Sequence, residues 1–317
     1  MSDVEENEPQ PEQHEREPVE KNQYTLDIFA DDEASIDLTM TRADHIPVLS
    51  RFTKLTELII KTTLLKEINT NLRPLVTLVD LDLYENQLTE IANLETLVNL
   101  KKLDLSYNRI REIKGLATLV QLRELYLVHN KIDAIKGLET LVNLELLELG
   151  DNRIRRLENV GHLAKLTKLF VGKNKIGRIE GIETLTGLVQ LSLPANRLTK
   201  LENLDTLTNL EEIYLSDQGL ETVEGLGQLK KLTVIDVASN ALTSLAPLAE
   251  LPALTDIWAN DNKIAAWPEV DKLAGLANLD TIYLERNPIY TSDVTGYRRK
   301  VMLALPQVKQ IDATACR

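Results

Sequence analysis

The chain has 317 residues, a net charge of −13 at pH 7 and a pI near 4.9. The first 35 residues contain 12 acidic and 2 basic side chains, a net charge of −10, which leaves −3 for the remainder. Proteins that bind nucleic acid or an anionic membrane normally present a basic face, and neither part of this chain supplies one. We therefore expect no nucleic-acid partner and no membrane partner.

Residues 1–35 are acidic, carry prolines and contain few apolar side chains, so we expect a disordered tail, either solubilising or regulatory. The start of the sequence does not resemble a secretory signal, and no apolar run reaches membrane-spanning length. Cys316 is the single cysteine, so an intramolecular disulfide is excluded. These features favour the cytosol or the nucleus.

Residues 36–77 have an irregular repeat pattern. Ile36 and Leu38 are predicted to point inward from a first coil, and a second coil starts at Leu55 without the asparagine found later in the chain. Terminal repeats are expected to be atypical, because an end coil has one neighbour and must shield the core.

Ten regular repeats follow in residues 78–287. The pattern is represented by LELLELGDN, from Leu144 to Asn152, and its first leucine recurs every 22 residues from Leu78 to Leu254, with a last step of 25 to Leu279. L-x-x-L-x-L-x-x-N at this period is the leucine-rich-repeat signature. It predicts an α/β leucine-rich-repeat solenoid: a curved parallel β-sheet on the concave face, short helical or 3₁₀ turns on the convex face, and capped ends. We expect a monomer when the protein is free.

The spacing within one repeat has a physical explanation. Side chains alternate along a strand, so Leu147 and Leu149 are predicted to enter the core while Glu148 points to the opposite face. Asn152 ends the strand, where its amide can bond the turning backbone, and stacked copies would form an asparagine ladder. Gln218 replaces one asparagine, and the ladder is either kept there by the longer amide or broken.

Three departures from the repeat concern its edges. Pro194 is compatible with a strand end but not with the middle of a strand. The 25-residue coil is expected to form an enlarged convex loop that carries Trp267. Residues 288–317 are predicted to form a C-terminal cap, with a helix from Tyr297 to Leu305 before Pro306 and a last short strand in VKQID.

Catalytic and metal-binding motifs are absent from the sequence. There are four histidines, no H-E-x-x-H, no phosphate-binding loop, no G-x-S-x-G and no cysteine cluster. We therefore expect neither an enzyme nor a cofactor or metal site.

The residues between the inward-pointing strand leucines form a row across the sheet, called here the central row. Its members are Asp82, Asp104, Tyr126, Glu148, Phe170, Ser192, Tyr214, Asp236, Trp258 and Tyr283. Five are aromatic and four acidic, whereas aromatic residues make up 4% of the chain. The row is predicted to point into water on the concave face and to bind a protein with a basic, partly apolar surface. The alternative is that the rings only stabilise the sheet by cross-strand stacking.

A second row lies two residues later and is small in its middle. This small row comprises Tyr84, Ser106, Val128, Gly150, Gly172, Pro194, Ser216, Ala238, Asn260 and Glu285. Small side chains beside large ones leave room for a partner to approach the aromatic anchors.

Several segments resemble a known family. NRIRRLENVGHL, YLSDQGLETVEGL, DVASNAL, WANDNKIAAW, YLERNP and above all YRRKVMLALPQVKQIDAT are similar to the leucine-rich-repeat regulatory subunits of protein phosphatase 1, the Sds-twenty-two family, over roughly residues 55–317. The resemblance implies a non-catalytic regulator whose concave face binds the phosphatase catalytic subunit. It further implies that a metal-deficient, inactive enzyme is held, in some cases together with phosphatase inhibitor-3.

The resemblance also implies which residues bind. Those that match the family's acid or aromatic are Asp104, Glu148, Phe170, Asp236, Trp258 and Tyr283, with Trp258 as a central anchor. Tyr126 stands where phenylalanine is usual, and Asp256 where glutamate is usual. Tyr214 is a candidate because it belongs to the aromatic row. A generic leucine-rich-repeat adaptor for another protein is the alternative function.

Overall fold

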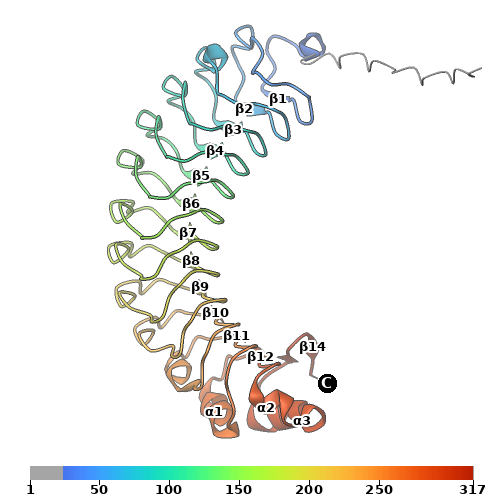
Figure 1. Ribbon diagram of the computed structural model, residues 1–317, viewed down its shortest axis with the longest axis vertical. Coiled ribbons are helices and arrows are strands. Elements are labelled where there is room, and N and C mark those ends of the chain that lie inside the picture. Colours follow the sequence, from blue (N-terminus) through green and yellow to red (C-terminus); the bar gives the residue numbers. More distant parts are fainter. Residues whose placement is uncertain (1–23, 317) are drawn as a thin grey trace, which may run out of the picture.

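The computed structural model describes residues 24–316 as a curved stack of coils (Figure 1). Each coil contributes one short strand to a single 14-stranded sheet in which the strands follow chain order. The first thirteen strands pair in parallel, and the last pair is antiparallel. The strands are β1 (Ser35–Asp37), β2 (Glu57–Ile59), β3 (Asp80–Asp82), β4 (Lys102–Asp104), β5 (Glu124–Tyr126), β6 (Leu146–Glu148), β7 (Lys168–Phe170), β8 (Gln190–Ser192), β9 (Glu212–Tyr214), β10 (Val234–Asp236), β11 (Asp256–Trp258), β12 (Thr281–Tyr283), β13 (Gln310–Ile311) and β14 (Thr314–Ala315).

The sheet register reproduces the sequence period. Leu147 on β6 pairs with Leu125 on one side and Leu169 on the other, each 22 residues away. These leucines and Leu149 are fully buried, and the core formed by such positions runs without a break from Ile36 to Ile311. One coil cannot bury these side chains alone, so the stack is stabilised by its neighbour contacts. The predicted solenoid is confirmed.

The asparagine ladder also forms. Asn174 is nearly buried; its Oδ1 accepts from the backbone N of Ile154 at 2.9 Å, and its Nδ2 donates to Leu149 O at 3.0 Å. Gln218 continues the ladder, since its Oε1 accepts from Leu198 N at 3.0 Å and its Nε2 donates to a backbone carbonyl of an earlier coil. The longer amide therefore keeps the ladder.

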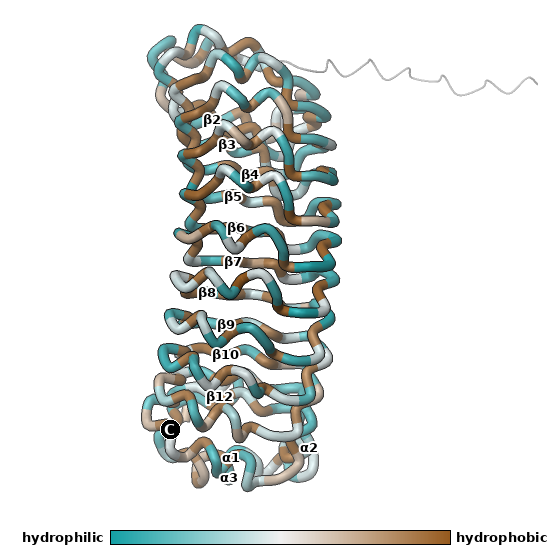
Figure 2. The backbone as a smooth tube through the Cα atoms, turned by 90° about the vertical axis from the view of Figure 1, so that its left-hand side faces the viewer, coloured by the Kyte–Doolittle hydropathy of each residue, from teal (hydrophilic) through white to brown (hydrophobic). Residues whose placement is uncertain are grey.

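The convex side is mostly irregular (Figure 2). Residues 83–233 are all described, and their outer segments contain no helix, only turns such as Leu97 N to Leu94 O at 3.0 Å. Short helices lie near the two ends: η2 (Thr70–Leu72), η3 (Ala246–Glu250), α1 (Trp267–Asp271) and η4 (Lys272–Gly275). The last two belong to the 25-residue coil, where the enlarged loop with Trp267 was expected.

The N-terminal end departs from the expected tail. Residues 24–34 lie against the first coils: a 3₁₀ helix, η1 (Leu26–Ile28), precedes Phe29, whose ring meets Phe52 edge-on at 6.5 Å. Tyr24 donates its hydroxyl to His45 O at 2.5 Å, and Arg51 Nη2 donates to Leu26 O at 2.6 Å. The tail prediction counted charge and missed these side chains, and its remaining part, residues 1–23, lies outside the described residues.

The C-terminal end is closed by helices and a hairpin. Helix α2 (Pro288–Thr291) leads to α3 (Val294–Ala304), which starts three residues before the predicted helix and is capped by Asp293 Oδ1 accepting from Gly296 N at 2.9 Å. Tyr297 of α3 is buried against Tyr290. Strand β13 forms in the expected segment, and β14, which was not predicted, folds back on it.

Candidate binding surface

The central row is the third residue of strands β3 to β12. The register pairs its members directly, from Asp82 beside Asp104 at one end to Trp258 beside Tyr283 at the other. All of the predicted row residues therefore lie side by side on one face. Asp256 begins β11 and lies two residues before Trp258, between Val234 and Thr281 of the flanking strands.

The central row is less exposed than the sequence suggested. Trp258 is the most accessible, with 36% of its surface exposed, whereas Asp236 is buried at 8%. The others are half-buried. The expectation that every member points freely into water is wrong for Asp236, because Tyr214 and Trp258 stand on the two neighbouring strands and cover it.

The acids of the row have a structural contact that the sequence analysis missed. Each accepts a hydrogen bond from the backbone N–H two residues later: Asp104 Oδ1 from Ser106 at 2.8 Å, Glu148 Oε1 from Gly150 at 3.1 Å, and Asp236 Oδ1 from Ala238 at 3.0 Å. These bonds satisfy the backbone donor where each strand ends. They hold the carboxylates close to the sheet.

The coil of β8 lacks both the acid and the backbone N–H that would bond to it. Ser192 replaces the acid there, and the residue two positions later is Pro194, which has no N–H. The proline carbonyl still accepts from Lys173 N at 2.7 Å, so the sheet hydrogen bonding continues past it. Pro194 is tolerated because the missing donor is the one that an acid would otherwise satisfy.

Burial alters the acidity of the row. Burial raises the pKa of Glu148 to about 7, with a smaller rise from the Asp104 charge, although the Gly150 N–H favours the ionised form. Burial also raises the pKa of Asp104 and of Asp236 above the usual range of a carboxyl. Desolvation is the main cause in each case, since a charge is less stable away from water. A nearby cation would restore the charged form.

The aromatic residues at the C-terminal end of the row form a cluster. The Trp258 ring lies between Tyr214 and Tyr283, at a centroid distance of 6.1 Å from each, with interplanar angles of 62° and 68°. Gln310 Nε2 donates to the Tyr283 hydroxyl at 2.9 Å. These contacts restrain the indole while leaving part of it open. It borders a hollow of about 430 Å³ with Asp236, Tyr283 and other residues, called here the tryptophan hollow.

Two tyrosines of the central row, Tyr126 and Tyr214, are held by acids on their own strands. The Tyr126 hydroxyl donates to Glu124 at 2.8 Å, and the Tyr214 hydroxyl donates to Glu212 at 2.8 Å. Both rings therefore lie along the sheet, with their polar ends occupied. Their faces, not their hydroxyls, are what they offer to a partner.

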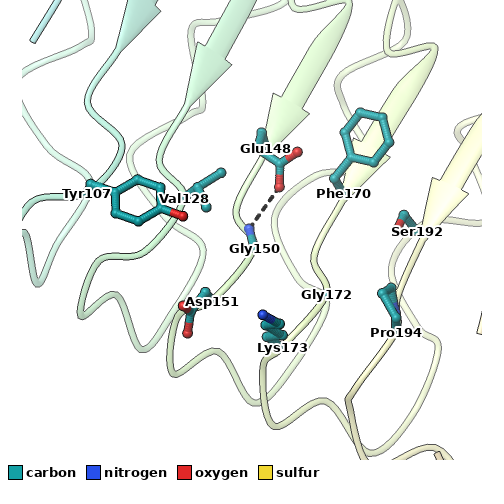
Figure 3. Close-up of a pocket in the computed structure, with 10 residues that line it drawn as sticks. All are labelled: Tyr107, Val128, Glu148, Gly150, Asp151, Phe170, Gly172, Lys173, Ser192 and Pro194. Atoms are coloured by element: carbon teal, nitrogen blue, oxygen red, sulfur yellow. Dashed lines mark hydrogen bonds between the residues drawn. The ribbon is translucent and has the colours of Figure 1, made fainter. Parts of the chain in front are cut away.

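A second hollow, the central hollow, lies at the middle of the arc (Figure 3). It measures about 240 Å³ and is lined by Tyr107, Val128, Glu148, Gly150, Asp151, Phe170, Gly172, Lys173, Ser192 and Pro194. Figure 3 shows Glu148 between Tyr107 and Phe170. The glycines keep it open: a Cβ on Gly172 would lie 2.9 Å from Pro194 Cγ.

A stack of rings that was not predicted lies beside this hollow. Tyr107 and His129 stand one residue past the small row, and Tyr84 belongs to the small row. Tyr107 stacks on His129 with centroids 4.7 Å apart and planes 20° apart, and Tyr84 continues the stack at 5.0 Å from Tyr107. His129 Nδ1 lies 2.6 Å from Asp151 Oδ2. The signal was present, since Tyr107, His129 and Asp151 each precede a ladder asparagine, but that position was not compared between coils.

Other site types receive no support from the described part of the chain. Within residues 24–316, no helix has the length and apolar character needed to cross a membrane. In the same range, no three or more histidine, cysteine or acidic side chains gather where they could hold a metal ion.

The family model described as leucine-rich repeat matches residues 105–215 and 191–317, and a second, for two copies of the repeat, matches residues 76–118. Together with the register and the ladder, these matches decide the family. The chain belongs to the leucine-rich-repeat family.

Curated relatives share part of this leucine-rich-repeat chain. The protein phosphatase 1 regulatory subunit SDS22 homolog of Caenorhabditis elegans is 55% identical over 78 residues, which are 25% of this chain and 24% of the relative. Protein phosphatase 1 regulatory subunit 7 of Homo sapiens is 54% identical over 54 residues, which are 17% of this chain and 14% of the relative. These matches confirm the resemblance stated from the sequence. They span at most about a quarter of each relative.

Solved structures share the leucine-rich-repeat fold. An internalin, inlF, from Listeria monocytogenes superposes with a TM-score of 0.71 at 23% identity, covering 89% of this chain and 87% of that one. The leucine-rich-repeat domain of APL1B gives a TM-score of 0.71 at 19% identity, covering 94% and 87%. At these identities the likeness supports the fold alone.

Proposed function

We propose that this protein is a non-catalytic regulatory subunit that binds the catalytic subunit of protein phosphatase 1 through its concave face. The observation that carries the proposal is the central row itself, whose acids and rings lie side by side on one sheet. The resemblance adds that six of its members match the family's acid or aromatic: Asp104, Glu148, Phe170, Asp236, Trp258 and Tyr283. The similarity to named phosphatase regulatory subunits supports the choice of partner.

The surface suits a basic partner with an apolar contact point. Trp258 is the anchor, because Tyr214 and Tyr283 already restrain its ring before binding. A restrained anchor loses little conformational freedom when it enters a partner's pocket. Central, desolvated aromatic residues commonly carry much of the binding energy of an interface.

The acids contribute through charge. Asp104, Glu148 and Asp236 are partly desolvated in the free protein, and each has one oxygen held by a backbone N–H. Lysine or arginine side chains of the phosphatase would supply the missing counter-charge. Complementary charge of this kind determines orientation and the rate of encounter as well as affinity.

The proposal also covers the metal content of the bound phosphatase, a third protein in the complex and the cellular compartment. The bound form is a metal-deficient, inactive catalytic subunit, in a complex that phosphatase inhibitor-3 can join, in nucleus and cytoplasm. The regulator contributes contacts and no catalytic group. The family resemblance supports each of these statements.

Calorimetric titration of the full chain against a type 1 phosphatase catalytic subunit, metal-loaded and metal-stripped, tests the proposal. A Glu148→Ala, Trp258→Ala double variant should lose binding, and wild type should prefer the stripped enzyme. The control is Val120→Ala, Asp133→Ala, which removes an apolar and an acidic side chain outside the central row. No binding of wild type to either form would reject the phosphatase as partner and leave an adaptor for another protein.

A further inference from the structure

The central hollow and the stack of rings beside it extend beyond the predicted rows. Tyr107, His129 and Asp151 occupy one loop position in three successive coils, each with a left-handed backbone at φ between 52° and 56°. This conformation favours glycine, asparagine and aspartate and is unfavourable for bulky side chains. Tyr107 is 42% exposed, so its ring contributes little to the core. The equivalent residues of the neighbouring coils, such as Glu85 and Lys173, have the same left-handed backbone, so this conformation belongs to the repeat. It is the exposure of the rings that indicates a contact surface.

The dimensions of the central hollow limit what can enter. Its volume of about 240 Å³ is below the range of roughly 300–1,000 Å³ that is usual for small-molecule sites. It is open between the Tyr107 and Phe170 rings, with Gly150 and Gly172 leaving space between them (Figure 3). A single long side chain fits these dimensions better than a helix or a metabolite.

The charges around the hollow favour a cation. Two carboxylates, Glu148 and Asp151, line it, against one base, Lys173. His129 holds one oxygen of Asp151 at 2.6 Å, which fixes that carboxylate beside the opening. Of the two cationic side chains, arginine suits the site better, because a planar guanidinium forms paired hydrogen bonds with carboxylates.

We propose that the central hollow receives an arginine side chain of the bound protein, with its guanidinium hydrogen-bonded to the Tyr107 hydroxyl and paired with Asp151. The inference rests on the proposed function, because it adds a second contact to the same partner. Glu148, which lines the central hollow, is on β6, and Trp258 is on β11, so the two contacts lie five coils apart. The two contacts together fix how the partner lies along the arc.

The test is calorimetric titration of the phosphatase catalytic subunit with single variants of the full chain. Tyr107→Phe, which removes the hydroxyl and keeps the ring stacked on His129, should weaken binding about tenfold, the size expected for a lost hydrogen bond to a cation, and Tyr107→Ala should weaken it at least as much. Asp151→Asn should weaken binding by a similar factor and flatten its dependence on salt. Asp133→Asn, which removes an exposed charge on the outer side, is the charge-matched control and should bind like wild type.

A double-mutant cycle identifies the cation. Asp151→Asn, combined in turn with arginine-to-lysine variants of the phosphatase surface, should show coupling to one arginine of about fivefold or more. If Tyr107→Ala and Asp151→Asn bind like wild type while Trp258→Ala is weakened, the inference fails and the proposed function stands. Binding of Tyr107→Phe within about twofold of wild type, or no coupled arginine, also overturns the inference. If wild type does not bind, both proposals are rejected.

Discussion

Glu148 and Gly150 are joined across the end of β6, where the Gly150 N–H donates to Glu148 Oε1 at 3.1 Å. The bond holds a carboxyl in a half-buried place between the Tyr126 and Phe170 strands. Burial there raises its pKa to about 7. A group of this kind links both folding stability and binding to pH.

The stability of wild type should fall as pH rises from about 5 to 8. The folded pKa of Glu148 is about 7 and lies above the value of 4.5 for a free glutamate side chain, so between these values the folded protein binds more protons than the unfolded one. The favourable contribution is complete below the unfolded pKa and is lost as pH rises through the folded pKa. Glu148→Gln keeps the acceptor without the charge, so it should gain up to about 2 kcal/mol over wild type at pH 8 and little at pH 5. Chemical denaturation at both pH values measures this, and parallel pH curves for the two proteins would contradict it.

Binding of a basic partner should release a proton near pH 7. A cation beside Glu148 lowers the pKa of its carboxyl, so affinity should rise with pH between about 6 and 8. Titrations in two buffers of different ionisation enthalpy should give different observed heats. That difference should shrink in Glu148→Gln, which serves as the control for protons released elsewhere. Equal proton release by both proteins would remove Glu148 as the source.

Trp258→Ala should cost at least ~2 kcal/mol of binding free energy, about thirtyfold in affinity. The indole is 36% exposed at the edge of the tryptophan hollow, so thermal stability should change much less than affinity does. Calorimetric titration and thermal unfolding separate the two effects. Unchanged affinity would refute the anchor assignment, and a large fall in melting temperature would show that the ring mainly supports the sheet.

Asn174→Ala should lower the free energy of unfolding by about 1–3 kcal/mol. The side chain is nearly buried, and its loss leaves the Ile154 N–H without a partner, whereas the three carbonyls that accept from Asn174 each keep a second donor. Asn143→Ala is the matched control, because Asn143 is half-buried and its hydrogen bond to Val120 O at 2.8 Å is open to solvent, so its loss should cost under about 1 kcal/mol. Urea denaturation of both variants measures the contrast, and equal losses would argue against a special role for the ladder.

The parts of the structure that the sequence predicted are those set by periodicity. The strand register, the buried leucines and the ladder follow from a 22-residue spacing, because stacking forces equivalent residues onto one line. Gln218 could not be decided in advance, since reach of its longer amide depends on local backbone geometry. The ordered segment at Phe29 was missed because a few apolar side chains outweigh the surrounding acidic composition once a coil is present to receive them.

The sequence predicted which residues share the candidate surface but not how exposed they are or which hydrogen bonds they form. Which residues share the central row depends only on alternation along a strand. That Asp236 is covered, or that Glu148 bonds Gly150, depends on how neighbouring side chains fold over the sheet. The Tyr107 and His129 stack lies past the strand, where the backbone turns left-handed and alternation no longer applies.

The unbroken register fixes the spacing between equivalent residues of successive coils. Glu148 and Trp258 are separated by five strand pairings, so they stand on the order of 24 Å apart along the sheet at ~4.8 Å a strand. A point substitution changes the side chain at position 148 or 258 but leaves the number of strands between the two positions, and hence the distance, unchanged. That distance changes only when a whole coil is gained or lost, in steps of one strand. A partner that contacts both Glu148 and Trp258 must therefore present its two contact groups at this separation, whatever their chemistry.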